Sequence, residues 1–195
     1  YYSDFDEGDV NRFFVISDNL FREIYDHGIS TYGPTKDWWV TRYSEEDEAG
    51  GMQVKATISG NVISYSGVGI YGIVVEEGAH VAVTGNVVTG YDVGIRFDHV
   101  WESTIEANLI ALCDDGIRTV TAYDNLITGN YIARCDYYGI YFENVDQAII
   151  GNYVTESWQS NSGVYISGQI YSTWAVGGLI ADNIIKQGGL TAKSD

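Results

Sequence analysis

Short apolar segments recur along the chain at an interval of about 22 residues. The clearest copy spans residues 105–110 (IEANLI) and is followed by an Asp-Asp-Gly-Ile motif at residues 114–117. Closely similar segments occupy residues 83–88, 127–132 and 149–154. A repeat of this length is typical of solenoids, in which each repeat forms one coil and buries its apolar residues against its neighbours.

An asparagine marks the same position in the aligned repeats. The residues three places before it and two places after it are isoleucine, valine or phenylalanine. These apolar runs are too short and too β-branched for helices, so we expect an all-β chain of about seven coils with three short strands each. Equivalent residues of stacked parallel strands lie about 4.8 Å apart, which allows the asparagines to form a hydrogen-bonded ladder. The expected asparagine ladder comprises Asn19, Asn61, Asn86, Asn108, Asn130, Asn152 and Asn183.

The repeats define a single domain. Residues 1–12 form an acidic and aromatic lead-in segment, and the coils occupy residues 13–190. Residues 33–51 interrupt the repeat with the only proline, two tryptophans and four consecutive acidic residues, so we expect a loop insertion there. Residues 191–195 are expected to form a short tail.

The Ile-x-Gly-Asn-x-Ile and Gly-Ile-x-Phe elements of the repeat resemble those of a known fold class. They are similar to the generic repeat of the right-handed parallel β-helix of the pectin-lyase-like class, over residues 13–190. The resemblance implies a right-handed β-solenoid. The class contains lyases, hydrolases, epimerases, phage tailspikes, adhesins and inert spacers, so the fold does not select an activity.

The charge balance excludes some partners. Asp and Glu number 27 against 10 Lys and Arg, for a formal charge of −17, which opposes binding to nucleic acid or to an anionic membrane. No apolar run is long enough to span a membrane. The chain begins at Tyr1 without a signal peptide, so we expect a mature or excised product located outside the cell or at its surface.

Aspartates form a column just before the glycine-isoleucine motif. Asp92, Asp114 and Asp136 each stand six residues after a ladder asparagine, and Asp115 lies beside Asp114. The placement of Asp114 and Asp115 resembles the paired aspartates of polygalacturonases, which implies a general acid and a water-activating carboxylate. The Gly-His-Gly and Arg-x-Lys elements of that family are missing, and residues 137–139 read Tyr-Tyr-Gly. The four aspartates are therefore candidate catalytic residues of an incomplete hydrolase site.

Arginines stand on the strand that follows these aspartates. Arg96 and Arg118 occupy equivalent outward positions, with His99 nearby and Tyr141 continuing the column. A lyase or an epimerase needs a cation to neutralise a uronate and a base to remove its proton. These four residues are candidates for substrate binding, with Tyr141 as a platform for a sugar ring. The alternative interpretation is ordinary charge pairing on an outward-facing strand.

Two further columns suggest a metal site and a covalent link. Glu102, Asp124 and Asp146 each stand six residues before an asparagine. Stacked like charges repel by roughly 1 kcal/mol per pair in water, so either calcium between the coils or solvation by counterions is expected.

Cys113 and Cys135 occupy equivalent positions on adjacent coils, where we expect either a disulfide or two stacked buried thiols.

The residue after each ladder asparagine is apolar or aromatic and is expected to point outward. A continuous column of this kind exceeds what monomeric proteins usually expose. No amphipathic helix is evident to cap either end of the coils. Both features favour self-association, either end-to-end or lateral. This apolar column comprises Leu20, Val62, Val87, Leu109, Tyr131, Tyr153 and Ile184.

Two functions are compatible with these patterns. The preferred hypothesis is an extracellular structural or assembly protein of a fibre, sheath or surface layer, which binds glycan or calcium in addition. The alternative is a polysaccharide-acting hydrolase or lyase, or a tailspike-like carbohydrate-binding module, that uses the aspartates and arginines. The missing hydrolase elements and the single large insertion favour the first hypothesis, and therefore a protein that is not an enzyme.

Overall fold

The computed structural model describes residues 12–32, 54–143, 146–156, 162–168, 179–186 and 189–194. Every regular element assigned within these residues is a β-strand. The expected insertion at residues 33–51 lies outside the described residues, as does all of the expected lead-in segment except Arg12. The described part of the chain contains no helix that could cross a lipid bilayer.

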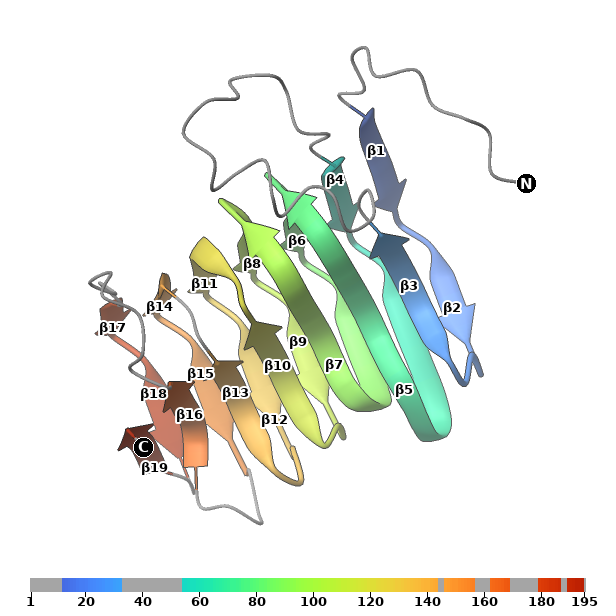
Figure 1. The fold of residues 1–195 in the computed structure, drawn as a ribbon. Coiled ribbons are helices and arrows are strands. Elements are labelled where there is room, and N and C mark those ends of the chain that lie inside the picture. Colours follow the sequence, from blue (N-terminus) through green and yellow to red (C-terminus); the bar gives the residue numbers. More distant parts are fainter. Residues whose placement is uncertain are drawn as a thin grey trace, which may run out of the picture.

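The strands are arranged in three stacks, and successive strands of one coil lie in different stacks (Figure 1). Each strand pairs in parallel with the equivalent strand of the neighbouring coil. The first stack contains β1 (Arg12–Ser17), β4 (Val54–Ser59), β6 (Ala82–Thr84), β8 (Thr104–Glu106), β11 (Tyr123–Thr128), β14 (Asp146–Ile150) and β17 (Leu179–Ala181).

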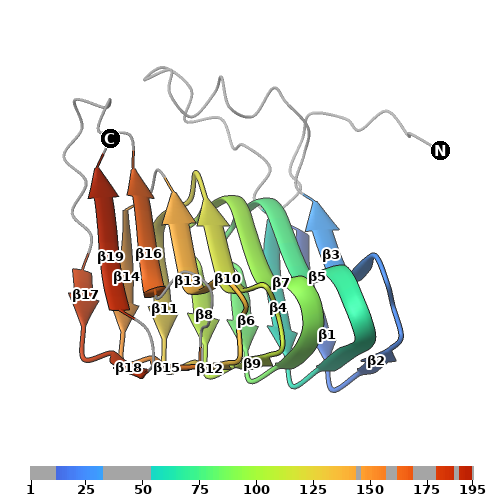
Figure 2. The ribbon, with the colours of Figure 1, turned by 90° about the horizontal axis from the view of Figure 1, so that it is seen from below.

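Two long strands bend around a corner and contribute to both of the other stacks. The second stack contains β2 (Leu20–Arg22), the beginnings of β5 (Val62–Ala79) and β7 (Val87–Trp101), β9 (Leu109–Ala111), β12 (Tyr131–Ala133), β15 (Tyr153–Thr155) and β18 (Ile184–Lys186). The third stack contains β3 (His27–Tyr32), the later parts of β5 and β7, β10 (Asp115–Val120), β13 (Tyr138–Glu143), β16 (Ser162–Gly168) and β19 (Gly189–Ser194). Figure 2 shows β10, β13, β16 and β19 side by side along one face.

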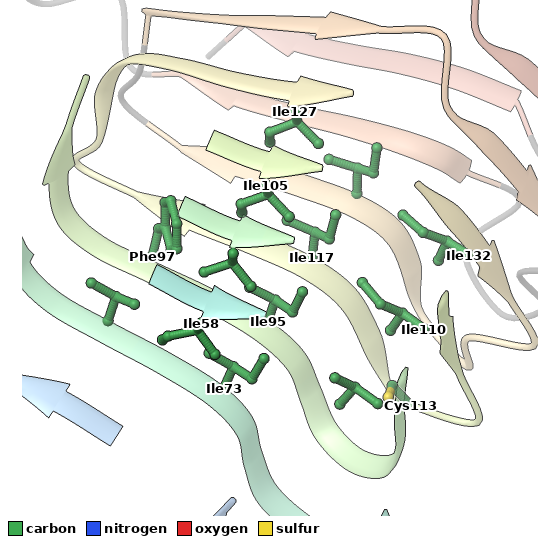
Figure 3. Packing of buried hydrophobic residues seen from close by; sticks show 14 of the residues in the cluster. Ile58, Ile73, Ile95, Phe97, Ile105, Ile110, Cys113, Ile117, Ile127 and Ile132 are labelled. Carbon is green, nitrogen blue, oxygen red and sulfur yellow. The ribbon is translucent and has the colours of Figure 1, made fainter. Parts of the chain in front are cut away.

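The interior of the coils is filled by columns of β-branched residues. Ile73, Ile95 and Ile117 pair in register in the third stack, and all three are fully buried (Figure 3). Comparable columns line the other two stacks. Burial of one such side chain contributes about 1.5–3 kcal/mol, and its Cβ branch suits a pleated surface. The core therefore repeats one register from coil to coil, as the sequence period predicts.

Hydrogen bonds along the corner between the first and second stacks form the predicted asparagine ladder. The Asn108 side-chain oxygen accepts from the backbone and side-chain nitrogens of Asn86, at 2.9 and 3.0 Å. The Asn108 side-chain nitrogen donates to the Val83 carbonyl and to the Asn130 side-chain oxygen. The same pattern runs from Asn19 to Asn183. The buried amides are thus satisfied by one another and by the backbone.

The last strand corrects one expected boundary. The tail expected from residue 191 onward is wrong as far as Ser194, because β19 pairs in parallel with β16 up to that residue. Continued pairing satisfies backbone groups that a free tail would leave to solvent.

Candidate functional site

The outer surface of the third stack gathers most of the predicted binding residues. Side chains alternate between the two faces of a strand, so the residue after each buried isoleucine points outward. Arg96 pairs in register with Arg118, and Arg118 pairs with Tyr141. We define the arginine face as the outward residues Tyr71, Arg96, Asp98, Asp115, Arg118 and Tyr141.

Arg96 is held by residues of its own coil and of the preceding one. Its Nη1 donates a hydrogen bond to the Tyr71 hydroxyl, and its Nη2 pairs with the Asp98 carboxylate. Its guanidinium carbon lies 5.1 Å from the centre of the Tyr71 ring, a cation–π distance. Desolvation lowers the pKa of Arg96, but the hydrogen bond and charge of Asp98 outweigh it and raise that pKa overall. Arg96 therefore carries its charge at a fixed place.

Asp98 extends this contact to the predicted residue His99. The Asp98 carboxylate lies 2.7 Å from His99 Nδ1. His99 has a φ of 55°, so the chain turns there, and its ring centre lies 6.5 Å from that of Trp101. A tyrosine hydroxyl, a guanidinium, a carboxylate and an imidazole thus form one connected chain of polar groups.

Arg118 leans toward the following coil, away from Arg96. Its guanidinium lies 4.9 Å from the Tyr141 ring centre, and its Nη1 lies 3.5 Å from an Asp115 carboxylate oxygen. The Tyr141 ring is itself 5.2 Å from that of Tyr138. Adjacent arginines repel one another, which explains why each pairs with a tyrosine on its outer side.

Asp115 is 6% exposed, although it stands on an outward position. Burial raises the pKa of Asp115 to about 6, while the charge of Arg118 and the Tyr138 backbone N–H oppose this shift. A carboxyl group with this pKa can hold or release a proton near neutral pH. Asp115 is therefore suited either to proton transfer or to a pH-dependent hold on Arg118.

The predicted aspartate column lies at the edge of the arginine face. The Asp114 N–H donates to the Tyr91 carbonyl, next to Asp92, and the Asp114 carbonyl accepts from the Tyr137 N–H, next to Asp136. Desolvation raises the pKa of Asp114, and repulsion from Asp92 and Asp136 raises it further. The structure therefore brings all four predicted aspartates into one neighbourhood.

The two arginines have unused hydrogen-bonding capacity. The buried Nε–H groups of Arg96 and Arg118 have no acceptor among the described residues, and one buried Asp115 oxygen has no donor. Buried polar groups in proteins are nearly always hydrogen-bonded, and exceptions commonly mark a place where water or a ligand binds. The Arg96 and Arg118 side chains are themselves partly exposed, so a planar anion such as a carboxylate can reach their outer N–H groups.

The expected calcium column is wrong. Asp146 pairs with Tyr123 and not with Asp124, because the register between β11 and β14 shifts by one residue there. Glu102 is 3.2 Å from His80 and is balanced by it when the imidazole is protonated. Within the described residues, no group of three His, Cys, Asp or Glu side chains could hold a metal ion.

The two cysteines are free, so the disulfide alternative is wrong and the stacked-thiol alternative holds. Cys113 Sγ contacts the Ala111 carbonyl at 3.4 Å, and Cys135 makes the equivalent contact with Ala133 at 3.9 Å. Burial raises the pKa of Cys113 to about 12 and that of Cys135 well above its ordinary value. Inward-facing thiols of this kind act as small apolar side chains.

Two residues of the arginine face, Tyr71 and Asp98, were not among the predicted site residues. Tyr71 stands in the same column as Val93 and Asp115. Asp98 stands two residues after Arg96, on the same side of the strand. Asp98 could have been found by moving one outward position along the strand from Arg96, whereas Tyr71 lies two coils from Asp115 with Val93 between them.

Two solved structures share the fold. One, a mutant of the periplasmic alginate epimerase AlgG, is 17% identical over 93% of this chain, with a TM-score of 0.65. The other, the A-module of the mannuronan C-5 epimerase AlgE4 of Azotobacter vinelandii, is 14% identical over 93% of this chain, with a TM-score of 0.57. The chain spans only 42% and 55% of these two proteins. At such identity the likeness shows the fold, and it confirms the predicted parallel β-helix.

A search of curated proteins found no match to this chain. A family model does match it, over residues 46–195, and its description is "Periplasmic copper-binding protein (NosD)". The periplasmic description of this family supports the predicted extracellular or cell-surface location, that of a secreted protein. Since the match covers well over half of the sequence, the chain belongs to the NosD family.

Proposed function

We propose that this protein binds an acidic polysaccharide, of the polyuronate class, along its arginine face. The observation that carries the proposal is the pair Arg96 and Arg118, which lie side by side on adjacent coils and whose side chains are 22% and 39% exposed. Guanidinium groups bind carboxylates through paired N–H donors, and such charge-assisted bonds are stronger than neutral ones.

The tyrosines beside the arginines support a sugar ligand over a small anion. Tyr71 and Tyr141 flank the pair on the preceding and following coils. A pyranose ring has an apolar face of C–H groups, which packs on an aromatic ring, while its carboxylate reaches a neighbouring cation. The strands of a β-helix hold these side chains at fixed spacing, so binding costs little side-chain conformational entropy.

The acidic character of the whole chain narrows the mode of binding. A formal charge of −17 opposes any polyanion at long range. Asp98 and Asp115 also stand within the arginine face. Recognition must therefore rest on direct arginine–carboxylate contacts, and we expect millimolar calcium or moderate salt to aid the approach by screening repulsion.

The names of the two solved structures point to the same ligand class. They are epimerases of alginate and of mannuronan, both of which are acidic polysaccharides. Removal of a proton next to a carboxylate needs a cation on that carboxylate and a nearby base. Arg96 is the cation, and Tyr71 and His99 are candidate bases in one connected network. Binding is the proposed function, and epimerisation or elimination is a proposed extension of it.

The hydrolase interpretation stays a proposal of lower rank. Asp114 and Asp115 both have a raised pKa, as a general acid requires. No histidine stands at residues 137–139, where the resembling family has one. Loss of polysaccharide turnover in an Asp114→Asn and Asp115→Asn double variant would support a hydrolase.

Copper, which the family description names, does not fit the described residues. Copper sites use cysteine, methionine and histidine donors. The chain has three histidines, two cysteines and one methionine, and Met52 lies outside the described residues. Each histidine pairs separately with a carboxylate, and both thiols are buried. No step of the proposed function involves copper.

Calorimetric titration of the whole chain with polymannuronate, polygalacturonate and a neutral glucan tests the proposal. We expect binding of at least one polyuronate and none of the neutral glucan. Arg96→Gln and Arg118→Gln should each weaken binding about ten- to a hundredfold, because each removes a charge-assisted hydrogen bond. Arg134→Gln is the matched control, since Arg134 pairs with Glu156 away from the arginine face.

Some outcomes would contradict the proposal. Equal binding of charged and neutral glycans, or equal loss in the Arg134→Gln control, would exclude specific carboxylate recognition. Proton NMR of the polymer after incubation measures epimerisation, and ultraviolet absorbance of unsaturated products measures elimination. Turnover that disappears in Tyr71→Phe would extend the function from binding to catalysis.

A second candidate function is lateral self-association through the apolar column. Five of its seven members are more than one-third exposed, in spite of their apolar or aromatic character: Leu20, Val62, Leu109, Tyr131 and Ile184. The Tyr131 and Tyr153 rings stack at 5.1 Å and 5° and keep this surface flat. A flat apolar sheet face is suited to packing against another sheet. We propose this role in addition to glycan binding, in agreement with the expected structural or assembly function.

A further inference from the structure

An aromatic corner lies beside the arginine face at the end of the molecule that contains β3. In β5 the register against β7 shifts between Ser64 and Gly69, so extra residues bulge outward at the turn between the second and third stacks. The Tyr25 and Tyr65 rings meet there edge to face, with centres 5.9 Å apart. Tyr25 is 60% exposed. The bulge thus places Tyr65 against Tyr25 of the preceding coil, and the Tyr25 ring remains exposed.

A buried tyrosine, Tyr91, packs against the inner side of the aromatic corner. Tyr91 is fully buried, and its hydroxyl donates to the Ile24 carbonyl at 3.0 Å. Its ring centre lies 6.5 Å from that of Tyr65. The next two coils have Cys113 and Cys135 at the position of Tyr91. The larger side chain fills the space under the bulge and keeps Tyr65 in place.

Two glycines allow this arrangement. A Cβ on Gly69 would lie 2.6 Å from the Tyr91 ring. Gly90 has a φ of +83°, and a Cβ there would lie 2.0 Å from the Tyr65 carbonyl oxygen. Glycine costs conformational entropy on folding, so its use at both places indicates that the close packing of the corner requires it. The corner is therefore a built feature rather than a loose turn.

The aromatic corner is continuous with the arginine face. The backbone N–H groups of Ile70 and Tyr71 donate to the carbonyls of Tyr25 and Asp26, at 2.9 and 3.0 Å. The His27 ring centre lies 5.1 Å from that of Tyr71, which in turn contacts Arg96. Backbone hydrogen bonds therefore join the corner to Tyr71, and the Tyr71 ring in turn contacts the first arginine.

We infer that the aromatic corner is a second glycan subsite, in which a sugar ring of the polyuronate held at Arg96 stacks on Tyr25. The inference rests on the proposed function. Glu23 and Asp26 flank the corner, so the subsite takes the apolar face and the hydroxyl groups of a sugar and repels its carboxylate. The polymer then runs across the coils. Its carboxylates bind the arginines, and one of its sugar rings stacks on the aromatic corner.

Oligosaccharide length separates the two subsites. A mannuronate disaccharide is short enough to occupy the arginine pair alone, whereas a hexasaccharide reaches the aromatic corner as well. We expect Tyr25→Ala to weaken binding of the hexasaccharide about three- to tenfold, the usual worth of an aromatic contact, and to leave the disaccharide unchanged. Tyr25→Phe keeps the ring and should bind both ligands as the unmodified protein does. Phe13→Ala is the matched control, because Phe13 is an exposed aromatic residue of the first stack, outside both the arginine face and the apolar column.

Each result separates this inference from the proposed function. Hexasaccharide binding that survives Tyr25→Ala unchanged would overturn the subsite and leave the arginine site intact. Equal loss for both ligands, or a loss matched by Phe13→Ala, would also overturn it. Absence of binding by the unmodified protein would overturn the proposed function and the inference together. Circular dichroism of each variant checks that the exposed substitutions leave the fold intact.

Discussion

Asp115 shows how one side chain can link stability to the proposed function. It lies under Arg118, and its pKa is raised from 3.8 to about 6. A group with a higher pKa in the folded than in the unfolded state stabilises the fold only while it is protonated. Its contribution is therefore present below about pH 4 and is lost as the pH rises to about 6.

Replacement of Asp115 by asparagine removes this pH-dependent loss. We expect Asp115→Asn to raise the free energy of unfolding at pH 7 by about 1–2 kcal/mol, with the gain shrinking toward pH 4. The same variant should bind polyuronate more weakly, because it no longer holds Arg118 by charge. Urea unfolding between pH 4 and pH 7 measures the first effect. Asp136→Asn, at an exposed residue of the next coil, should change the unfolding free energy by less than about 0.5 kcal/mol at either pH.

A constant gain at all pH values would show that burial of the charge is not the cause. A loss of stability at pH 7 would show that the ion pair with Arg118 outweighs desolvation.

At the scale of the element, the corner before each ladder asparagine has a fixed backbone conformation. The residue preceding the asparagine has a positive φ in every coil of the described residues, and it is glycine in four of them. Its members are Asp18, Gly60, Gly85, Ala107, Gly129, Gly151 and Asp182. A side chain at Gly85 would meet no atom within 4 Å, so the preference for glycine there is conformational.

Ala107 is the unfavourable member of this set. Its φ is 53°, and it lacks the short polar side chain that helps aspartate adopt this region. We expect Ala107→Gly to raise the free energy of unfolding by about 0.5–1 kcal/mol. The substitution relieves the left-handed backbone strain of the folded state, and the greater conformational entropy of glycine in the unfolded chain offsets part of that gain. Thermal or urea unfolding measures it. The control Ala111→Gly, within strand β9, should instead lower stability by about 0.5–1 kcal/mol. A loss in Ala107→Gly of the same size as in the control would contradict the argument.

The elements could be predicted from the sequence because the core imposes one register on successive coils. Buried columns and the asparagine ladder recur at a 22-residue spacing from Asn86 to Asn152, so counting from one coil predicts the next. Asp146 was wrongly aligned with Asp124 because the pairing register shifts between Tyr123 and Asn125. The spacing of the buried residues in the sequence does not reveal this shift. Outward residues are less constrained than buried ones. Tyr71, Val93 and Asp115 share a column without sharing any chemical property, which is why Tyr71 was missed.

At the scale of the whole molecule, the three stacks present three different surfaces. The third carries the arginine face, and the second carries the apolar column. The apolar column has no charged residue among its members, whereas the arginine face is dense in charge. Two surfaces of unlike chemistry on one rigid solenoid can bind unlike partners at the same time, so glycan binding and self-association need not compete.

Self-association through the apolar column predicts a concentration-dependent size. We expect the sedimentation coefficient of the unmodified protein to rise with concentration in the micromolar range, since the column exceeds the apolar surface that monomers usually expose. Leu109→Asp places a charge at the middle of the column, where Leu109 is 42% exposed, and should abolish the rise without unfolding the chain. Val15→Asp is the matched control, because Val15 is 55% exposed on the first stack, outside the column. A coefficient that stays constant in the unmodified protein would exclude the assembly role, and a rise abolished equally by both substitutions would assign it to net charge rather than to this surface.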